Sequence, residues 1–285
     1  MEKTMKKNPI TEGVIWKQML LFCIPVMAGT LFQQLYNIVD VIVVGRFVST
    51  KALACVGGSS GMMINLFVGF FTGMTSGVTV IVARYFGAAD WRHLSEGIHT
   101  SVAIAIIGGV LFGVLGVAFA PLLLQLLGTP EELMNGSLLY LRIYFTGILF
   151  TFLFNTGSAI LRALGDSKQP LYYLMICCFV NIVLDVLLVV VFHLGIAGVA
   201  IATVTAQAVS SYMVLHALQH LKEQFRVKWK QIKFHKQLFF EIIRIGLPAG
   251  IQSVMNSLSG MIMTSAVNSL GTIAVAGNTA YAKLD

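Results

Sequence analysis

The stretch Gln33-Gln34-Leu35-Tyr36-Asn37-Ile38-Val39-Asp40 lies inside the first long apolar segment of the sequence. On a helix, three of its polar residues share one face with Asp40, because they stand seven, four and three positions before it. They are Gln33, Tyr36 and Asn37. A carboxylate in hydrocarbon costs at least about 2.5 kcal/mol unless it faces a cavity or a partner. Asp40 is therefore predicted to have a functional role in a membrane, and a structural tie between helices is the alternative.

The composition defines the class of protein. Hydrophobic residues make up 57% of the chain and charged residues only 11%, with a mean hydropathy of +0.84. Apolar runs of about 20 residues, long enough to span a bilayer, recur along the sequence. The predicted fold class is an all-α polytopic membrane protein. Seven spans are expected, at 14–45, 58–86, 96–124, 137–161, 169–192, 196–218 and 239–269.

The distribution of Lys and Arg predicts the orientation. When they are assigned to alternating sides of these spans, fifteen fall on one side and four on the other. Such a bias places the positive side, with the N-terminus, in the cytoplasm of a multi-pass protein of the plasma (inner) membrane. The basic run 222–236 is then a cytoplasmic connector beside anionic lipid headgroups, and no nucleic-acid partner is expected. The four residues of the other side are Arg46, Lys51, Arg142 and Lys283.

Small residues recur at every fourth position in several spans. This spacing lets helix backbones approach closely in lipid, so a tightly packed bundle is expected. The stripes are Gly69, Gly73 and Gly77; Gly109 and Gly113; and Gly198, Ala202 and Ala206.

An internal repeat indicates how the chain is divided. The segment 20–33 resembles 243–256 at an offset of 223 residues, and 50–54 resembles 272–276 at an offset of 222. Six helices per copy is an even number, so both copies would enter the membrane from the same side. The predicted organisation is a cytoplasmic N-terminus (1–13), a six-helix lobe (14–218), a basic connector (219–238) and the first helix of an incomplete second repeat (239–285). We expect a truncated product or fragment of a protein of roughly 450 residues, extrapolating the repeat.

Two further spans carry polar pairs at helical spacing. Asn181 and Asp185 form one pair, and Thr203 and Gln207 the other. Counting at about 1.5 Å per residue from the helix ends places Asp40, Asp185 and Thr203 roughly 9 to 12 Å below the same surface. If they meet, two carboxyl groups in a low dielectric cannot both ionise cheaply, so one can carry a proton. Oxygen ligands of this kind also suit Na⁺, and the alternative is a hydrogen-bonded tie in the core.

Other chemistry is not indicated. The cysteines Cys23, Cys55, Cys177 and Cys178 lack metal-ligand spacing. His93, His99 and His193 stand near segment ends and are interpreted as interfacial residues. Because no Ser-His, HExxH or phosphate-loop pattern occurs, no enzyme activity, cofactor or metal site is expected.

The sequence resembles the multidrug and toxic compound extrusion (MATE) family of transporters. The resemblance runs in the family's order across nearly the whole chain. Its matching motifs are Gln34–Asp40, Gly73–Gly77 with Ala83–Ala88, Leu161–Lys168 with Pro170, Asn181–Asp185, and Gly195–Ala200 with Ala202 and Thr203.

The resemblance implies a twelve-helix protein of two six-helix lobes that exports cationic or amphipathic compounds in exchange for H⁺ or Na⁺. It also implies that Asp40, Asn181, Asp185 and Thr203 form the coupling site of the first lobe. Gln33, Gln34, Tyr36, Asn37 and Gln207 are then expected to form the substrate-facing or supporting polar surface. Since Gly246-Leu247-Pro248 is followed by no acidic residue until Asp285, the chain looks like the DinF-like branch, with coupling in the first lobe.

The function predicted from the sequence is therefore a secondary antiporter, and the 285-residue form alone is expected to be inactive without the missing C-terminal lobe. Two alternatives remain open. A lipid-linked oligosaccharide flippase of the same superfamily would need basic residues lining the central cavity. A non-transporting membrane scaffold would keep its function without Asp40.

Overall fold

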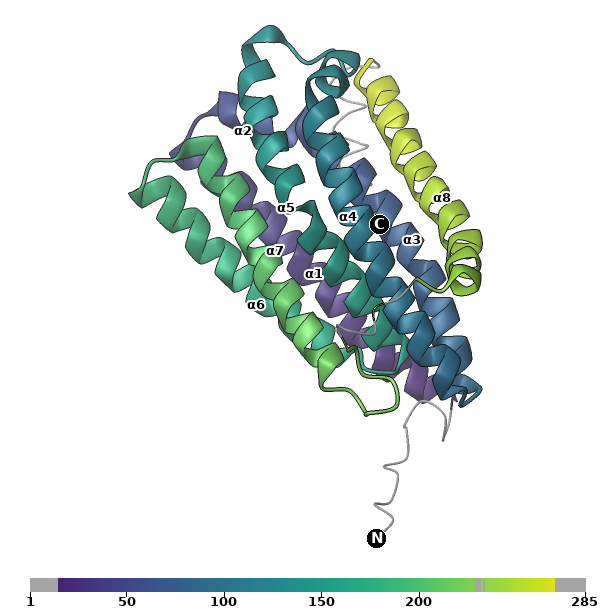
Figure 1. The fold of residues 1–285 in the computed structure, drawn as a ribbon. Helices are drawn as coiled ribbons and strands as arrows, with labels where there is room; N and C mark the ends of the chain where they lie inside the picture. Colours follow the sequence, from purple (N-terminus) through teal and green to yellow (C-terminus); the bar gives the residue numbers. More distant parts are fainter. Residues whose placement is uncertain (1–14, 229–231, 233, 270–285) are drawn as a thin grey trace.

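The computed structural model describes residues 15–228, 232 and 234–269, and its regular structure is helical (Figure 1). Among these residues, seven helices are long and apolar enough to cross a membrane, which confirms the predicted all-α polytopic class. In chain order the elements are α1 (Ile15–Phe47), α2 (Thr50–Gly57), α3 (Ser59–Gly87), α4 (Trp91–Leu126), α5 (Glu131–Ala163), α6 (Lys168–Asp185), η1 (Val186–Val191), α7 (Gly195–Gln219) and α8 (Lys236–Ser269).

Two helices begin where a side chain caps them. Ser49 accepts a hydrogen bond of 3.0 Å from the backbone N–H of Ala52, which starts the short helix α2 in a segment expected to be a connection. Asp90 accepts from the N–H of His93 at 3.2 Å, so α4 begins five residues earlier than predicted. That backbone bond, with the contact to the His93 ring, holds the pKa of Asp90 below its usual range.

The fifth predicted span is not a continuous α-helix. After Asp185 the chain continues as the π-helical segment η1, where the N–H of Phe192 donates to the carbonyl of Leu187, five residues earlier, at 3.0 Å. π-Helical turns are rare and occur frequently at functional sites. The change of helix type falls at the residue next to Asp185.

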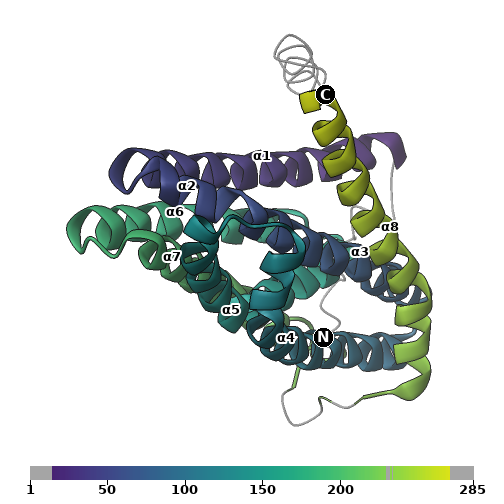
Figure 2. The same ribbon diagram turned by 90° about the horizontal axis from the view of Figure 1, so that it is seen from above.

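Helix α5 lies at the centre of the packing, in contact with α2, α3, α4, α6 and α7. Helix α1 packs against α2, α6, η1 and α7, whereas α8 packs against α3 and α4. Viewed from above, α1 and α8 therefore lie over different parts of the bundle (Figure 2). The main apolar core is formed between α3, α4, α5 and α7 and includes Phe145, Phe152 and Val214.

The glycine stripes make the close contacts predicted for them. A Cβ atom on Gly73 would lie 2.5 Å from the carbonyl oxygen of Ala249 in α8, and one on Gly77 would overlap the carbonyl of Ile242. On α4, a Cβ on Gly109 would lie 2.7 Å from a methyl group of Leu149 in α5. Backbones approach at these points because no side chain intervenes.

The described part of the connector between α7 and α8 is held against α4. The N–H of Lys228 donates to Nε2 of His99 at 3.1 Å, and the N–H of His235 donates to the hydroxyl of Thr100 at 3.3 Å. Phe225 stacks on Trp91 with ring centroids 5.9 Å apart. His99, interpreted from the sequence as interfacial, is buried beneath this connector with 3% of its surface exposed.

Several predictions concern residues outside the described part of the chain. They include the N-terminal segment 1–13 with its lysines, Lys230 and Lys233 of the connector, the repeat segment 272–276, Lys283 and Asp285. The predicted domain boundaries remain predictions.

Candidate functional site

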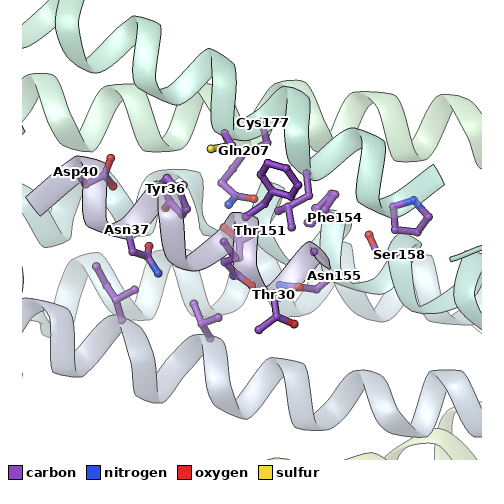
Figure 3. A pocket seen from close by; sticks show the side chains of 18 of the residues that line it. Thr30, Tyr36, Asn37, Asp40, Thr151, Phe154, Asn155, Ser158, Cys177 and Gln207 are labelled. Atoms are coloured by element: carbon purple, nitrogen blue, oxygen red, sulfur yellow. The ribbon is translucent and has the colours of Figure 1, made fainter. Parts of the chain in front are cut away.

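A cavity of about 410 Å³ lies between α1, α3, α5, α6 and α7. Its walls carry polar side chains over much of their length, and Figure 3 shows Asp40 at one end and Ser158 toward the other. A polar cavity inside a bundle of membrane-length helices is the environment in which intramembrane ionisable residues are found.

Helix α1 supplies one polar wall of this cavity. Gln33, Tyr36, Asn37 and Asp40 all line it, as their shared helical face predicts. Tyr36, Asn37 and Asp40 are labelled in Figure 3. Gln34 is exposed and does not line this cavity, and its supporting role stays a prediction.

Asp40 lies beside the polar pair of α6. Its carboxyl group interacts with the side chains of Asp185 and Asn181. Asp40 is 8% exposed, and Asn181 and Asp185 are fully buried. The structure therefore brings together three of the four residues predicted to form a coupling site, and it brings them from two helices that pack against each other.

The polar atoms of this group are largely unsatisfied. Oδ1 of Asp40, both carboxyl oxygens of Asp185 and both amide atoms of Asn181 are buried without a hydrogen-bond partner among the described residues. Each unpaired buried polar group costs about 1–3 kcal/mol. The geometry concentrates oxygen ligands in a buried place where a proton or a small hard cation would satisfy them.

Thr203 and Gln207 of α7 differ in hydrogen bonding and in access to the cavity. The buried hydroxyl of Thr203 donates to the carbonyl of Val199 in its own helix at 3.0 Å, and Thr203 does not line the cavity. Gln207 does line the cavity, and its Oε1 is buried without a partner among the described residues. The structure thus places Gln207, one turn from Thr203, closer to the predicted polar surface.

A polar stripe on α5 was not predicted from the sequence. Thr151, Asn155, Ser158 and Arg162 stand at positions i, i+4, i+7 and i+11, and all four line the cavity. The first three are visible in Figure 3. This stripe could have been predicted from the sequence, because polar residues at this spacing within an apolar segment share one face of a helix.

The described residues thus form a bundle of membrane-length helices around a polar cavity. The MatE family model matches residues 25–187, which is more than half of the chain. The chain therefore belongs to the MatE family of transporters, as the resemblance read from its motifs predicted.

Known relatives agree with this assignment. The probable multidrug resistance protein YpnP of Bacillus subtilis is 32% identical over 99% of this chain and 62% of its own length. The multidrug export protein MepA of Staphylococcus aureus is 24% identical over 93% of this chain and 58% of its own length. The chain thus spans about 60% of the length of the curated relatives it matches.

Solved structures share the fold. An outward-facing multidrug resistance MATE family transporter is 24% identical, with a TM-score of 0.85 over 95% of this chain and 60% of that one. A MATE structure in complex with MaD3S gives a TM-score of 0.87 at 24% identity, over 97% of this chain and 62% of that one. Assignment to the DinF-like branch stays a prediction.

Proposed function

We propose that this bundle serves a secondary antiporter, in which H⁺ or Na⁺ bound at Asp40, Asn181 and Asp185 drives the export of a cationic or amphipathic compound. The observation that carries the proposal is the position of Asp40. Its carboxyl group interacts electrostatically with the buried pair on α6, and Asp40 also lines the cavity. A change in charge at the buried pair therefore changes the electrostatic potential at the cavity wall.

The chemistry follows from two neighbouring carboxyl groups in a low dielectric. Asp40 and Asp185 cannot both carry a negative charge there at low cost, so they hold a proton or a shared cation between them. Loss of that ion leaves an uncompensated negative charge at the cavity, which attracts a cationic substrate. When the ion binds again, it neutralises this charge and lowers the affinity for the cationic substrate. The ion and the substrate therefore exchange.

Helix α1 is the element proposed to respond. It carries Asp40, contains Pro25 within its length, and packs mainly against α2, α6, η1 and α7. Proline removes a backbone hydrogen bond and allows a helix to bend. A change at the Asp40–Asp185 contact would therefore alter how α1 lies on α6.

We further propose that the chain lies in the plasma (inner) membrane with its N-terminus in the cytoplasm, on the basis of the positive-inside bias. We also propose that it needs no cofactor. Its partners are the coupling ion, the exported compound and the lipid bilayer. The proposed function is transport rather than catalysis. Because the relatives are longer, we propose that export requires a second lobe completing the cavity.

The flippase alternative predicted several basic residues along the cavity. Among the described residues that line the cavity, Arg162 is the one Lys or Arg side chain. A long anionic oligosaccharide headgroup would be poorly compensated by a single guanidinium, so the antiporter remains the better-supported function.

The test is ion-driven export from proteoliposomes. The chain is joined to the second lobe of the Bacillus subtilis relative, and efflux of ethidium is followed under an imposed pH or Na⁺ gradient. We expect gradient-dependent export that is lost in Asp40→Asn, and no export by the 285-residue chain alone. Undiminished efflux by the Asp40→Asn protein would refute the coupling role of Asp40.

A further inference from the structure

The end of the cavity opposite Asp40 contains a cationic side chain. Arg162 stands in the last turn of α5 and lines the cavity together with Ser158, one turn earlier. The hydroxyl of Ser158 is buried, with 1% of the residue exposed, and it has no hydrogen-bond partner among the described residues. A positive charge and an unsatisfied hydroxyl thus face the same space.

No acidic group in the described part of the chain compensates this arginine. Among those residues, the guanidinium of Arg162 has no ion pair and no hydrogen bond, whereas Arg84, Arg92 and Arg226 each pair with a glutamate. The nearest acid in sequence, Asp166, instead accepts the N–H groups of Lys168 and Gln169 at 3.1 and 3.0 Å. The guanidinium therefore keeps its five N–H donors for something that enters the cavity.

The cavity walls carry apolar side chains as well as these polar groups. Leu171 and Leu174, in the first two turns of α6 that follow Arg162 in the chain, line the cavity, as does Val26 of α1. A planar cationic fork next to apolar side chains matches a molecule that has an oxyanion at one end and a hydrocarbon body behind it. An inorganic anion would bind the guanidinium but would make no contact with the apolar walls.

This region is distant from the proposed coupling site. Tyr140 of α5 interacts with Asp40, and Arg162 follows it by 22 residues in the same helix, which corresponds to about 33 Å along the axis. The two ends therefore bind separately, and a ligand at Arg162 does not depend on the ion at Asp40.

We propose that Arg162 and Ser158 form a second binding site, which takes the carboxylate or phosphate headgroup of an amphipathic molecule. The headgroup accepts two parallel hydrogen bonds from the guanidinium and one from the Ser158 hydroxyl. Two sources supply this chemistry: an acidic phospholipid entering from the bilayer, or a water-borne amphiphilic compound.

The test uses the purified 285-residue chain in dodecyl maltoside and decyl phosphate as the probe, titrated calorimetrically. Titration into empty micelles provides the reference, and decyltrimethylammonium provides a probe of opposite charge with the same hydrocarbon body. The variants are Arg162→Gln, Arg162→Lys and Ser158→Ala. Arg142→Gln is the matched control, because it removes the same charge from an exposed arginine that does not line the cavity.

We expect Arg162→Gln to weaken decyl phosphate binding by at least about tenfold, since hydrogen bonds to charged groups are the strong ones. Arg162→Lys and Ser158→Ala should give intermediate losses, and Arg142→Gln none. Decyltrimethylammonium binding should not weaken in Arg162→Gln. Equal affinity for decyl phosphate in Arg162→Gln and Arg142→Gln would overturn the proposal. Should Arg162→Gln fail to fold, unchanged binding in both Arg162→Lys and Ser158→Ala would also overturn it.

Nanodiscs distinguish the two sources. In discs of phosphatidylcholine alone, wild type should bind decyl phosphate as it does in detergent. A loss of affinity when phosphatidylglycerol is added, absent in Arg162→Gln, supports a lipid headgroup as the occupant. Equal affinity in both kinds of disc supports a water-borne amphiphile. The binding measurement is independent of export, so its failure would leave the antiport proposal standing.

Discussion

Single carboxyl groups in this chain are in very different environments. Asp166 accepts two backbone N–H groups at the start of α6, whereas both oxygens of Asp185 are buried without a hydrogen-bond partner among the described residues. The first arrangement is that of a structural cap. The second reduces stability, and such groups are retained where function requires them.

This contrast predicts opposite effects for the same substitution. Asp185→Asn should raise the free energy of unfolding by roughly 1 kcal/mol, or about 2–4 °C in Tm, because it removes one of two adjacent buried carboxyl groups. Asp166→Asn should lower stability, because the amide is a weaker acceptor for the helix N-terminus. Thermal unfolding in detergent measures both. A loss of stability in Asp185→Asn would show instead that Asp185 is a structural tie.

Part of the arrangement of these polar residues could be predicted from the sequence. The helical spacing of Gln33, Tyr36, Asn37 and Asp40 correctly predicted a shared cavity face. It did not exclude Gln34, because the rotation of α1 is decided by its packing against α6 and α2. Nor could depth counting show that the Thr203 hydroxyl would bond within its own helix.

At the scale of elements, close backbone contact joins α8 to the six-helix bundle. Gly73 and Gly77 of α3 face Ala249, Ile242 and Gly246 of α8 with no side chain between them. The every-fourth-residue pattern predicted tight contacts, but it could not name the partner helix. The short helix α2 was missed because its apolar run is too short to stand out. The π-helical turns of η1 were missed because they lie inside a long apolar span, and hydropathy does not distinguish one helix type from another.

Gly77→Val should therefore loosen α8. Its Cβ would overlap the carbonyl of Ile242, and accommodating it should cost about 1–3 kcal/mol of unfolding free energy. Gly87→Val is the control, because a Cβ on Gly87 meets nothing within 4 Å and should change stability by about 0.5 kcal/mol. Unfolding in increasing SDS, followed by circular dichroism, compares the two. Equal effects would mean that the glycine contact does not determine how α8 packs.

The connector between α7 and α8 is the second link between these elements. Nε2 of His99 accepts the N–H of Lys228 at 3.1 Å, and Nδ1 of the same ring lies 2.7 Å from the carbonyl oxygen of Ser95. His99→Leu removes this acceptor and should release the backbone around Lys228.

Limited trypsin digestion measures that release. We expect cleavage after Lys222, Arg226 and Lys228 to become several-fold faster in His99→Leu, because local opening exposes the backbone. His193→Leu, at an exposed histidine just before the start of α7, should digest like wild type. Identical digestion of the two variants would show that His99 does not hold the connector.

The described part of the molecule combines a tightly packed bundle with a polar cavity whose ends differ in charge. Composition and hydropathy sufficed to predict the class, because membrane spans must satisfy their backbone hydrogen bonds internally and therefore form helices. Depth counting placed Asp40 and Asp185 at a similar depth, but it could not show whether they meet, because that depends on how α1 packs against α6. Arg162 was assigned from the sequence to a membrane surface, and its contact with the cavity emerged only from the fold.

The most direct test of the central claim is ion-induced release of a bound cation from the purified chain. Ethidium is bound to the 285-residue protein in dodecyl maltoside, and its fluorescence is followed as pH is lowered or Na⁺ is added, in wild type and in Asp40→Asn. We expect one of the two ions to displace ethidium from wild type, and we expect Asp40→Asn to bind ethidium weakly and no longer respond to that ion. Ion-dependent release that is the same in both proteins would contradict the claim that Asp40 couples the ion to the cavity.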